Sequence, residues 1–293
     1  MASYADFVRG ELLELPLKRP CCKKALTAGL LINAEMRERQ LTVCYKQQDV
    51  AAFAAAELRR QLGKMPECRV ISAYGHSRWE LSLISGAADK LLSAMDRGDR
   101  AAVMNETCEG CHSALLRGAF LACGTLNDPR KSTSLELLLA DPTRVPFLEG
   151  VLSDGGHCPG IAERQGVTGL YFKNGNAVEE LITLMGAARA AMEIMNVRIE
   201  RDIRNQENRA TNCVAKNIEK SVSAASRQMA AIEKLTVTGM LAQLPEAVRA
   251  TALLRAENPD ATLEELRNMH NPPITKSGLN HRLQKLVTEA EKL

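Results

Sequence analysis

The chain has 293 residues, of which 45 % are apolar, so it can bury sizeable cores and has room for two or three domains. Aromatic residues make up only 3 %, which disfavours base-stacking platforms for single-stranded nucleic acid. A net charge of +3 means that any nucleic-acid footprint is a local patch. No apolar run reaches the length of a membrane span, and the N-terminus lacks the apolar core of a signal peptide. We therefore expect a cytoplasmic chain without a membrane partner.

The first hundred residues alternate between helix and strand patterns. We predict helices at Tyr4–Leu13, Cys22–Glu35, Val50–Leu62 and Ala87–Met95, and strands at Leu41–Tyr45, Val70–Ala73 and Trp79–Ile84. The clearest strand signal is the alternation of Leu41, Val43 and Tyr45. A turn at Gly75–Ser77 is expected to join the last two strands.

The pattern Cys-x-x-Ala-Leu-x-x-Gly occurs at Cys22–Gly29 and again at Cys111–Gly118. After the second copy, the elements follow the order of the first half. They are a strand at Ser134–Leu139, a helix at Pro142–Leu152, strands at Gly160–Arg164 and Gly169–Lys173, and a helix at Val178–Gly186. This repeated order predicts two pseudo-symmetric halves.

Small residues recur one helical turn apart in both copies of the pattern. They are Ala25 and Gly29 in the first copy, and Ala114, Gly118 and Ala122 in the second. Such stripes allow two helix backbones to approach closely. We expect the halves to join along these helices, with their sheets forming a saddle in front.

The nine cysteines are odd in number and lack the spacing of a disulfide framework, so we expect reduced thiols, most of which pack in the core. Cys108–His112 matches the c-type haem signature, but that attachment requires an exported chain. The same spacing suits half of a zinc site, with either His157-Cys158 or Cys21-Cys22 as the second pair. Because Cys111 aligns with Cys22, where no Cys-x-x-Cys exists, packing is favoured. No metal, cofactor or catalytic residue is assigned.

Residues 187–235, which follow Gly186, contain neither glycine nor proline and are expected to be largely helical. A polar stripe of this segment comprises Arg201, Asn205, Asn208, Asn212 and Lys216 at helical spacing, and Arg204 and Arg209 flank it. Asparagine is a poor helix former, so a line of asparagines calls for a reason. The stripe either binds phosphates or bases, or forms a packing network between domains, or marks a break in the helix.

The C-terminal stretch contains three short helix patterns. The first, Ala247–Ala256, closes at Asn258-Pro259 because proline cannot continue a helix. Thr262 and Glu265 form a capping box at the start of the second, whose apolar side is expected to carry Leu263, Leu266 and Met269. His270–Pro273 ends it.

The third helix opens at Ile274-Thr275 and repeats Leu279, Leu283 and Leu286 at helical spacing. Its polar residues are Thr275, Lys276, Ser277, Asn280, His281, Arg282 and Lys285. Three short helices with a tight break before the last match the helix-turn-helix pattern, in which the last helix enters the major groove. Lysine, arginine, asparagine and serine are side chains that read bases or bind phosphates. The alternative is a small bundle with a basic third helix.

Several runs carry a family resemblance. Leu116–Gly124 and Ala28–Leu31 resemble the helix motif of LAGLIDADG homing endonucleases. Arg117–Pro129, Arg204–Asn212 and Lys276–Leu283 resemble the WhiA family of bacterial regulators, across nearly the whole chain.

The resemblance implies an α+β fold of two LAGLIDADG-like halves, a connecting helix and an all-α helix-turn-helix domain. The corresponding segments are residues 1–104, which include the N-terminal helix, 105–190, 191–239 and 240–293.

In homing endonucleases each motif helix ends in an acid that holds a divalent metal. Alignment on the motif glycines puts Ala34 and Cys123 at those positions, and neither residue can hold Mg²⁺. Glu35 is one residue late, about 100° round the expected helix. The sequence therefore predicts no nuclease activity and a chain that is not an enzyme.

The resemblance further implies a sequence-specific regulator of transcription that binds double-stranded DNA and is linked to cell division, chromosome segregation and, in spore formers, sporulation. Implied partners are an RNA polymerase sigma factor or another regulator and, in actinobacteria, an iron–sulfur protein. We expect a nucleoid-associated monomer. The alternatives are a protein-interaction scaffold and a residual metal-dependent DNA endonuclease.

Overall fold

The structure is a computed structural model that describes residues 3–73, 76–164 and 166–293. It divides into two compact units, residues 1–201 and residues 202–293. Of the turn expected at Gly75–Ser77, Gly75 lies outside the described residues, whereas His76 and Ser77 already belong to a strand.

The two halves of the first unit share one sheet topology. The strands of the first half are β1 (Glu35–Arg37), β2 (Gln40–Tyr45), β3 (Glu67–Ala73) and β4 (His76–Ile84), in the order β1-β2-β4-β3. Those of the second half are β5 (Gly124–Leu126), β6 (Leu135–Leu139), β7 (Gly160–Arg164) and β8 (Val167–Phe172), in the order β5-β6-β8-β7. Every neighbouring pair is antiparallel. The equal strand order confirms the internal repeat.

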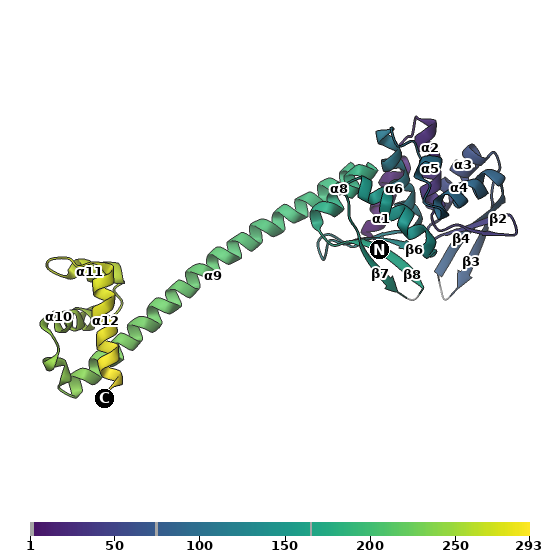
Figure 1. The fold of residues 1–293 in the computed structure, drawn as a ribbon. Coiled ribbons are helices and arrows are strands. Elements are labelled where there is room, and N and C mark those ends of the chain that lie inside the picture. The colour runs from purple at the N-terminus through teal and green to yellow at the C-terminus, as the bar shows by residue number, and fades with distance from the viewer. Residues whose placement is uncertain (1–2, 74–75, 165) are drawn as a thin grey trace. The chain divides into compact units, whose positions relative to one another are not determined.

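Helices cover one side of the two sheets (Figure 1). The first half contributes α1 (Tyr4–Glu14), α2 (Pro20–Leu30), α3 (Gln48–Leu62), α4 (Gly86–Asp96) and α5 (Arg100–Val103). The second half contributes α6 (Glu109–Cys123), the 3-10 helix η1 (Pro142–Arg144), α7 (Val145–Asp154) and α8 (Gly175–Met185). The α+β class expected for this part of the chain is confirmed.

The core lies between the helices and the covered faces of the sheets. Leu41, Val43 and Tyr45 of β2 are buried, as their alternation predicts. The Tyr45 hydroxyl donates a hydrogen bond of 2.9 Å to the carbonyl oxygen of Leu30, at the end of α2. The first sheet is thereby joined to the helix that carries the small-residue pattern.

Helices α2 and α6 touch through their backbones at two glycines. A Cβ atom on Gly29 would lie 2.6 Å from the backbone nitrogen of Ala119 and closer still to the carbonyl oxygen of Leu115. A Cβ atom on Gly118 would lie 2.8 Å from the nitrogen of Leu30. No larger residue fits at either position without moving a helix, so the predicted close approach is confirmed.

The expected helix at Cys22–Glu35 is wrong at its C-terminal end. Helix α2 stops at Leu30, a turn follows, and Glu35 opens β1. Leu31 and Ile32 are fully buried in this turn, so the apolar pattern continues past the end of the helix. Glu35 therefore lies on a strand rather than one step further round a helix. Strands β1 and β5 escape sequence analysis because three residues are too few for alternation to be visible.

The second unit combines most of a long helix with a 3-10 helix and three further α-helices. Helix α9 runs from Ala188 to Val237, and its residues from Asp202 onward belong to this unit. It is followed by the 3-10 helix η2 (Met240–Gln243), α10 (Glu246–Glu257), α11 (Leu263–Met269) and α12 (Lys276–Glu291). The capping box of α11 is confirmed, because the Thr262 hydroxyl accepts from the Glu265 amide at 3.2 Å and the Glu265 carboxylate accepts from the Thr262 amide at 2.7 Å.

One hydrophobic core holds the second unit together. It consists of Ala231, Ile232, Leu235, Val248, Ala252, Leu266, Leu279, Leu283, Leu286 and Ala290. The expected apolar side of α11 is wrong at Met269, which is 44 % exposed, whereas Leu266 is buried in the core and Leu263 packs against it. Because the core begins at Ala231, the last turns of α9 pack with the helices that follow. The four-segment division of the chain stays a prediction.

Among the described residues, no helix is both long and apolar enough to cross a membrane.

We predict that Gly118→Ala destabilises the first unit by about 1–3 kcal/mol, because the added methyl group must push α2 and α6 apart. The measurement is the midpoint of urea unfolding of the full chain, monitored by circular dichroism. Gly10→Ala is the matched control, since a Cβ there meets nothing within 4 Å and alanine stabilises a helix by about 0.5–1 kcal/mol relative to glycine. Equal midpoints for Gly118→Ala and the unchanged chain would contradict the close-packing argument.

Candidate nucleic-acid interface

Helix α12 buries one side and exposes the other. Leu279, Leu283 and Leu286 are buried in the core of the second unit. Thr275 caps the helix by accepting a hydrogen bond of 3.1 Å from the amide of Gly278. The N-terminal turn, whose free amides and helix dipole favour phosphate, is therefore well formed.

The predicted DNA-reading residues lie on the exposed side of α12 or at its rim. Those exposed are Thr275, Lys276, Ser277, Asn280 and His281. Arg282 and Lys285 are half-buried at the rim. The Arg282 guanidinium donates to the carbonyl oxygen of Ala247 in α10 at 3.4 Å. The exposed face thus presents amide, hydroxyl and imidazole groups, with Lys276 in its first turn and Arg282 and Lys285 at its rim.

Gln284 belongs to the same exposed face but is absent from the predicted set. It is exposed, and it follows Asn280 by four residues and His281 by three. A glutamine amide has the same bidentate capacity for adenine as asparagine. Helical spacing from Ser277 and Asn280 would have identified it.

The turn before α12 is held by a buried histidine. His270 is 8 % exposed, and its Nε2 atom lies 3.4 Å from the Thr251 hydroxyl of α10. Burial, and then the nearby charge of Arg282, lower the pKa of His270 below its ordinary value. The folded unit therefore favours the neutral imidazole.

The polar stripe of α9 is exposed except at Arg201, which is half-buried and donates a hydrogen bond of 2.7 Å to the carbonyl oxygen of Pro129. Arg204, Asn205, Asn208, Arg209 and Asn212 are all exposed, and the helix continues through them without interruption. The predicted alternative of a helix break at this point is wrong. From Asn212 to Ala231, where α9 enters the core, the helix rises by about 28 Å. The stripe and the face of α12 are therefore separate surfaces.

The two positions predicted to have lost a metal-binding acid lie at or just beyond the C-terminal ends of the paired helices. Ala34 is 1 % exposed and follows the turn after α2. Cys123 is the last residue of α6, and burial raises the pKa of its thiol to about 12. The thiol donates to the carbonyl oxygen of Ala119 at 3.2 Å. A neutral thiol and a methyl group offer no oxygen ligand to a hard cation.

Buried guanidinium groups donate hydrogen bonds to backbone carbonyl oxygens at these helix ends. Arg144, 3 % exposed, donates from Nη1 to the carbonyl oxygens of Ile32 at 3.0 Å and Ala34 at 2.6 Å. Arg9, also buried, donates to the carbonyl oxygen of Gly124 just after α6. Positive charge at a helix C-terminus is favourable, and it repels a divalent cation. Each of these two positions therefore lies beside a buried guanidinium group.

Comparison with known proteins adds to this geometry. The family described as "WhiA C-terminal HTH domain" matches residues 208–290, and the one described as "WhiA LAGLIDADG-like domain" matches residues 112–204. A relative from Ruminiclostridium cellulolyticum, named "Probable cell division protein WhiA", is 32 % identical over 99 % of this chain and 98 % of its own length. The chain belongs to the WhiA family. A namesake from Alkaliphilus metalliredigens is 29 % identical over 99 % of this chain and 98 % of its own length.

Solved WhiA structures show the same fold. Full-length DUF199/WhiA from Thermatoga maritima superposes with a TM-score of 0.60 at 21 % identity, covering 99 % of this chain and 98 % of that one. The N-terminal LAGLIDADG domain of DUF199/WhiA gives a TM-score of 0.53 at 16 % identity, over 64 % of this chain and 94 % of its own. The predicted membership in the WhiA family and the predicted fold, LAGLIDADG-like halves followed by a helix-turn-helix, are both confirmed.

The cysteines of this WhiA-family chain are not all scattered through the fold. Cys108 and Cys111, whose spacing suggested half of a zinc site, lie beside Cys21 and Cys22. All four thiols are free. Of the two second pairs considered from the sequence, the structure selects the one from α2.

The pKa shift of His270 predicts a pH-dependent stability. Because the folded-state pKa is lowered, the contribution of His270 is fully present above the ordinary value of about 6.5 and is lost as the pH falls below it. Between about pH 7.5 and about pH 5.5, the melting temperature of the chain should fall more than that of the His270→Gln variant. Parallel pH profiles for the two proteins would refute this assignment.

Proposed function

We propose that the chain is a regulator of transcription that binds double-stranded DNA at specific sites through α12. The observation that carries the proposal is the exposed side of α12, where Ser277, Asn280 and His281 sit between Lys276, Arg282 and Lys285. Ammonium, amide, hydroxyl and imidazole groups such as those of Lys276, Asn280 and His281 read base edges, whereas the cations at the rim bind phosphates. We assign base reading to Lys276, Ser277, Asn280 and His281, and phosphate contact to Arg282, Lys285 and the Thr275 cap.

The biological setting is inferred from the relatives. The named relatives are called cell division proteins, and the same role is proposed here. Chromosome segregation and sporulation are the processes in which a nucleoid-bound regulator of this kind would act. An RNA polymerase sigma factor or another regulator is the proposed protein partner. Because the first unit lacks metal-binding acids at Ala34 and Cys123, we infer that it serves as an interaction surface rather than a nuclease site.

We further infer that the first unit does not cleave DNA. Ala34 and Cys123 lack carboxylates, and Arg144 and Arg9 supply positive charge at the carbonyl ends where a cation would otherwise bind. Basic residues of the first sheet are also partly neutralised: Arg37 pairs with Glu35 at 2.6 Å, and Arg69 with Glu67 at 3.5 Å. We therefore assign DNA binding to the second unit.

The first test removes the proposed phosphate contacts of α12. Arg282→Gln with Lys285→Gln should weaken binding to every duplex and reduce the slope of log K against log salt by about 1.8, since each phosphate contact contributes about 0.9. Binding is measured by fluorescence anisotropy over a salt series, with a fragment selected from genomic DNA and with a random duplex. The control, Lys64→Gln with Lys90→Gln, removes the same charge from exposed positions of the first unit. An unchanged slope in the α12 variant would overturn the assignment of phosphate contacts. Separately, nicking of a duplex by the unchanged chain in the presence of Mg²⁺ would overturn the inference that the first unit does not cleave DNA.

The second test separates the two remaining interpretations of the polar stripe of α9. Replacing Asn205, Asn208 and Asn212 with alanine raises helix propensity, by up to about 0.7 kcal/mol per residue. If the amides contact DNA, affinity falls at least about fivefold despite the more stable helix, because each hydrogen bond contributes about 0.5–1.5 kcal/mol. We predict this loss.

The matched control for the stripe replaces Asn217, Ser221 and Ser223, which are exposed polar residues of the same helix. Its affinity for DNA should stay unchanged. Equal affinities for both triple variants would leave the stripe without a role in DNA binding.

A further inference from the structure

Four cysteines converge at the N-terminal ends of the two paired helices. Cys21 and Cys22 lie in the first turn of α2, Cys108 is the N-cap residue of α6, and Cys111 lies in its first turn. Their sulfur atoms all lie within 4.8 Å of one another. The sulfur of Cys108 is 3.7 Å from that of Cys21 and 3.7 Å from that of Cys22.

This spacing matches that of one tetrahedral ion. Four thiolates about 2.3 Å from a zinc ion at tetrahedral corners lie about 3.8 Å from one another. A disulfide would require two of the sulfur atoms to lie about 2.05 Å apart. An iron–sulfur cluster places several irons and sulfides between its thiolates, which spreads them further than a single ion does. The set of four is therefore sized for one metal ion.

We propose that Cys21, Cys22, Cys108 and Cys111 form a structural Zn²⁺ site that joins the N-terminal ends of α2 and α6. Closed sites of four cysteines are characteristic of structural zinc, because no coordination position is left for substrate. On binding, the thiols release their protons to solvent and the sulfur atoms become the ligands.

The surroundings suit a negatively charged set of ligands. Arg19 Nη1 lies 3.4 Å from the sulfur of Cys108. Both helices direct the positive ends of their dipoles toward the sulfur atoms. Gly110 leaves room for this convergence, because a Cβ atom there would lie 3.0 Å from the sulfur of Cys22. Core packing alone gives no reason for four sulfur atoms to meet under a guanidinium group and two helix N-termini.

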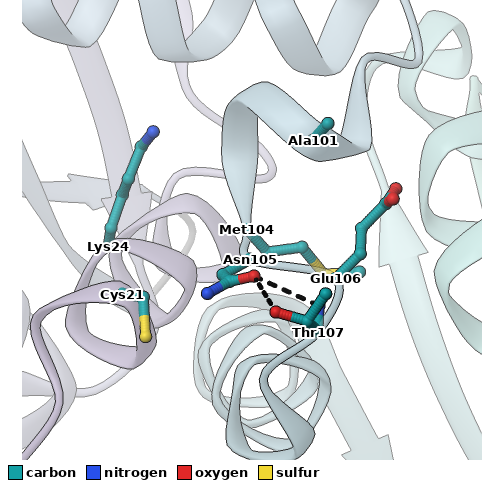
Figure 2. Close-up of a pocket in the computed structure, with 7 residues that line it drawn as sticks. All are labelled: Cys21, Lys24, Ala101, Met104, Asn105, Glu106 and Thr107. Carbon is teal, nitrogen blue, oxygen red and sulfur yellow. Dashed lines mark hydrogen bonds between the residues drawn. The ribbon is translucent and has the colours of Figure 1, made fainter.

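A loop positions the Cys108 pair and borders an opening to solvent. The Asn105 side chain accepts from the Thr107 amide at 3.1 Å and from its hydroxyl at 2.8 Å, and the Asn105 carbonyl accepts from the Cys108 amide at 3.0 Å. The adjoining pocket, of about 390 Å³, is lined by Cys21, Lys24, Ala101, Met104, Asn105, Glu106 and Thr107 (Figure 2). Cys21 thus lies on a route by which an ion or a chelator reaches the site.

This site lies at the opposite ends of α2 and α6 from Ala34 and Cys123. It is therefore distinct from the position where homing endonucleases hold their catalytic metal. Its proposed role is to fix the two helices, and with them the two halves, against each other. The role does not depend on whether the chain binds DNA.

We expect the purified full chain, produced with zinc in the medium and dialysed, to contain about one zinc ion per chain, following the four-ligand stoichiometry of structural sites. The measurement is inductively coupled plasma mass spectrometry. Cys108→Ser with Cys111→Ser should lose the ion, whereas the control Cys44→Ser with Cys68→Ser, which changes two exposed cysteines of the first sheet, should retain it. Retention of the ion by the Cys108 and Cys111 variant would overturn the proposal.

A second measurement guards against misfolding of the cysteine variants. Replacing zinc with Co²⁺ in the unchanged chain should produce the thiolate-to-cobalt charge-transfer and visible bands of a tetrahedral four-sulfur site. Removal of the metal with a chelator should lower the melting temperature, and added Zn²⁺ should restore it. The proposal fails if the chain holds no metal and gives no cobalt bands, if iron takes the place of zinc, or if mass spectrometry shows a disulfide among these cysteines.

Discussion

The first unit depends on the backbone contact between α2 and α6. Gly29 and Gly118 leave no room for a Cβ atom, so the helices approach until carbonyl and amide groups of one touch the other. That approach brings the corresponding ends of the helices together on both sides of the crossing. The N-terminal ends gather four sulfur atoms, and the C-terminal ends present carbonyl oxygens to buried arginines. One steric constraint thus creates two sites of opposite electrostatic character.

Helix dipoles explain which groups occupy which end. The N-terminal ends carry partial positive charge and favour thiolates, whereas the C-terminal ends carry partial negative charge and favour guanidinium groups. In a homing endonuclease, carboxylates at the C-terminal ends of the helices hold an exchangeable metal cation there. Here the guanidinium groups of Arg144 and Arg9 are held by carbonyl oxygens and by the carboxylates of Asp96 and Asp6 at 2.8 and 2.9 Å. A bound guanidinium cannot activate water as a metal does.

In the second unit, helical spacing separates buried apolar residues of α12 from exposed polar ones. Leucines at helical spacing on α12 fill the core, which leaves amide, hydroxyl and basic groups on the exposed side. His270 contacts Thr251 of α10 from the turn before α12, and burial lowers its pKa, so the neutral imidazole is favoured at this support of the helix. The exposed face and its support are therefore made by different residues, and they can be altered separately.

Patterns of local origin were readable from the amino-acid order alone. Alternation located β2, a threonine and a glutamate located the start of α11, and the repeated small residues indicated the close pair of helices, because each signal resides within a few neighbouring residues. The same signals failed where tertiary packing overrode them. Leu31 and Ile32 are apolar because a turn buries them, not because α2 continues.

Long-range groupings were decided by the tertiary structure. Cys22 and Cys108 are 86 residues apart, and Ala34 and Arg144 are 110 apart. Spacing along the chain could only offer two candidate partners for the Cys-x-x-Cys pair. It gave no indication that Arg144 would lie beside the end of α2. Local order specified which helices and caps form. Only the crossing at the two glycines determined which side chains meet at their ends, because contact between distant segments depends on how the helices pack.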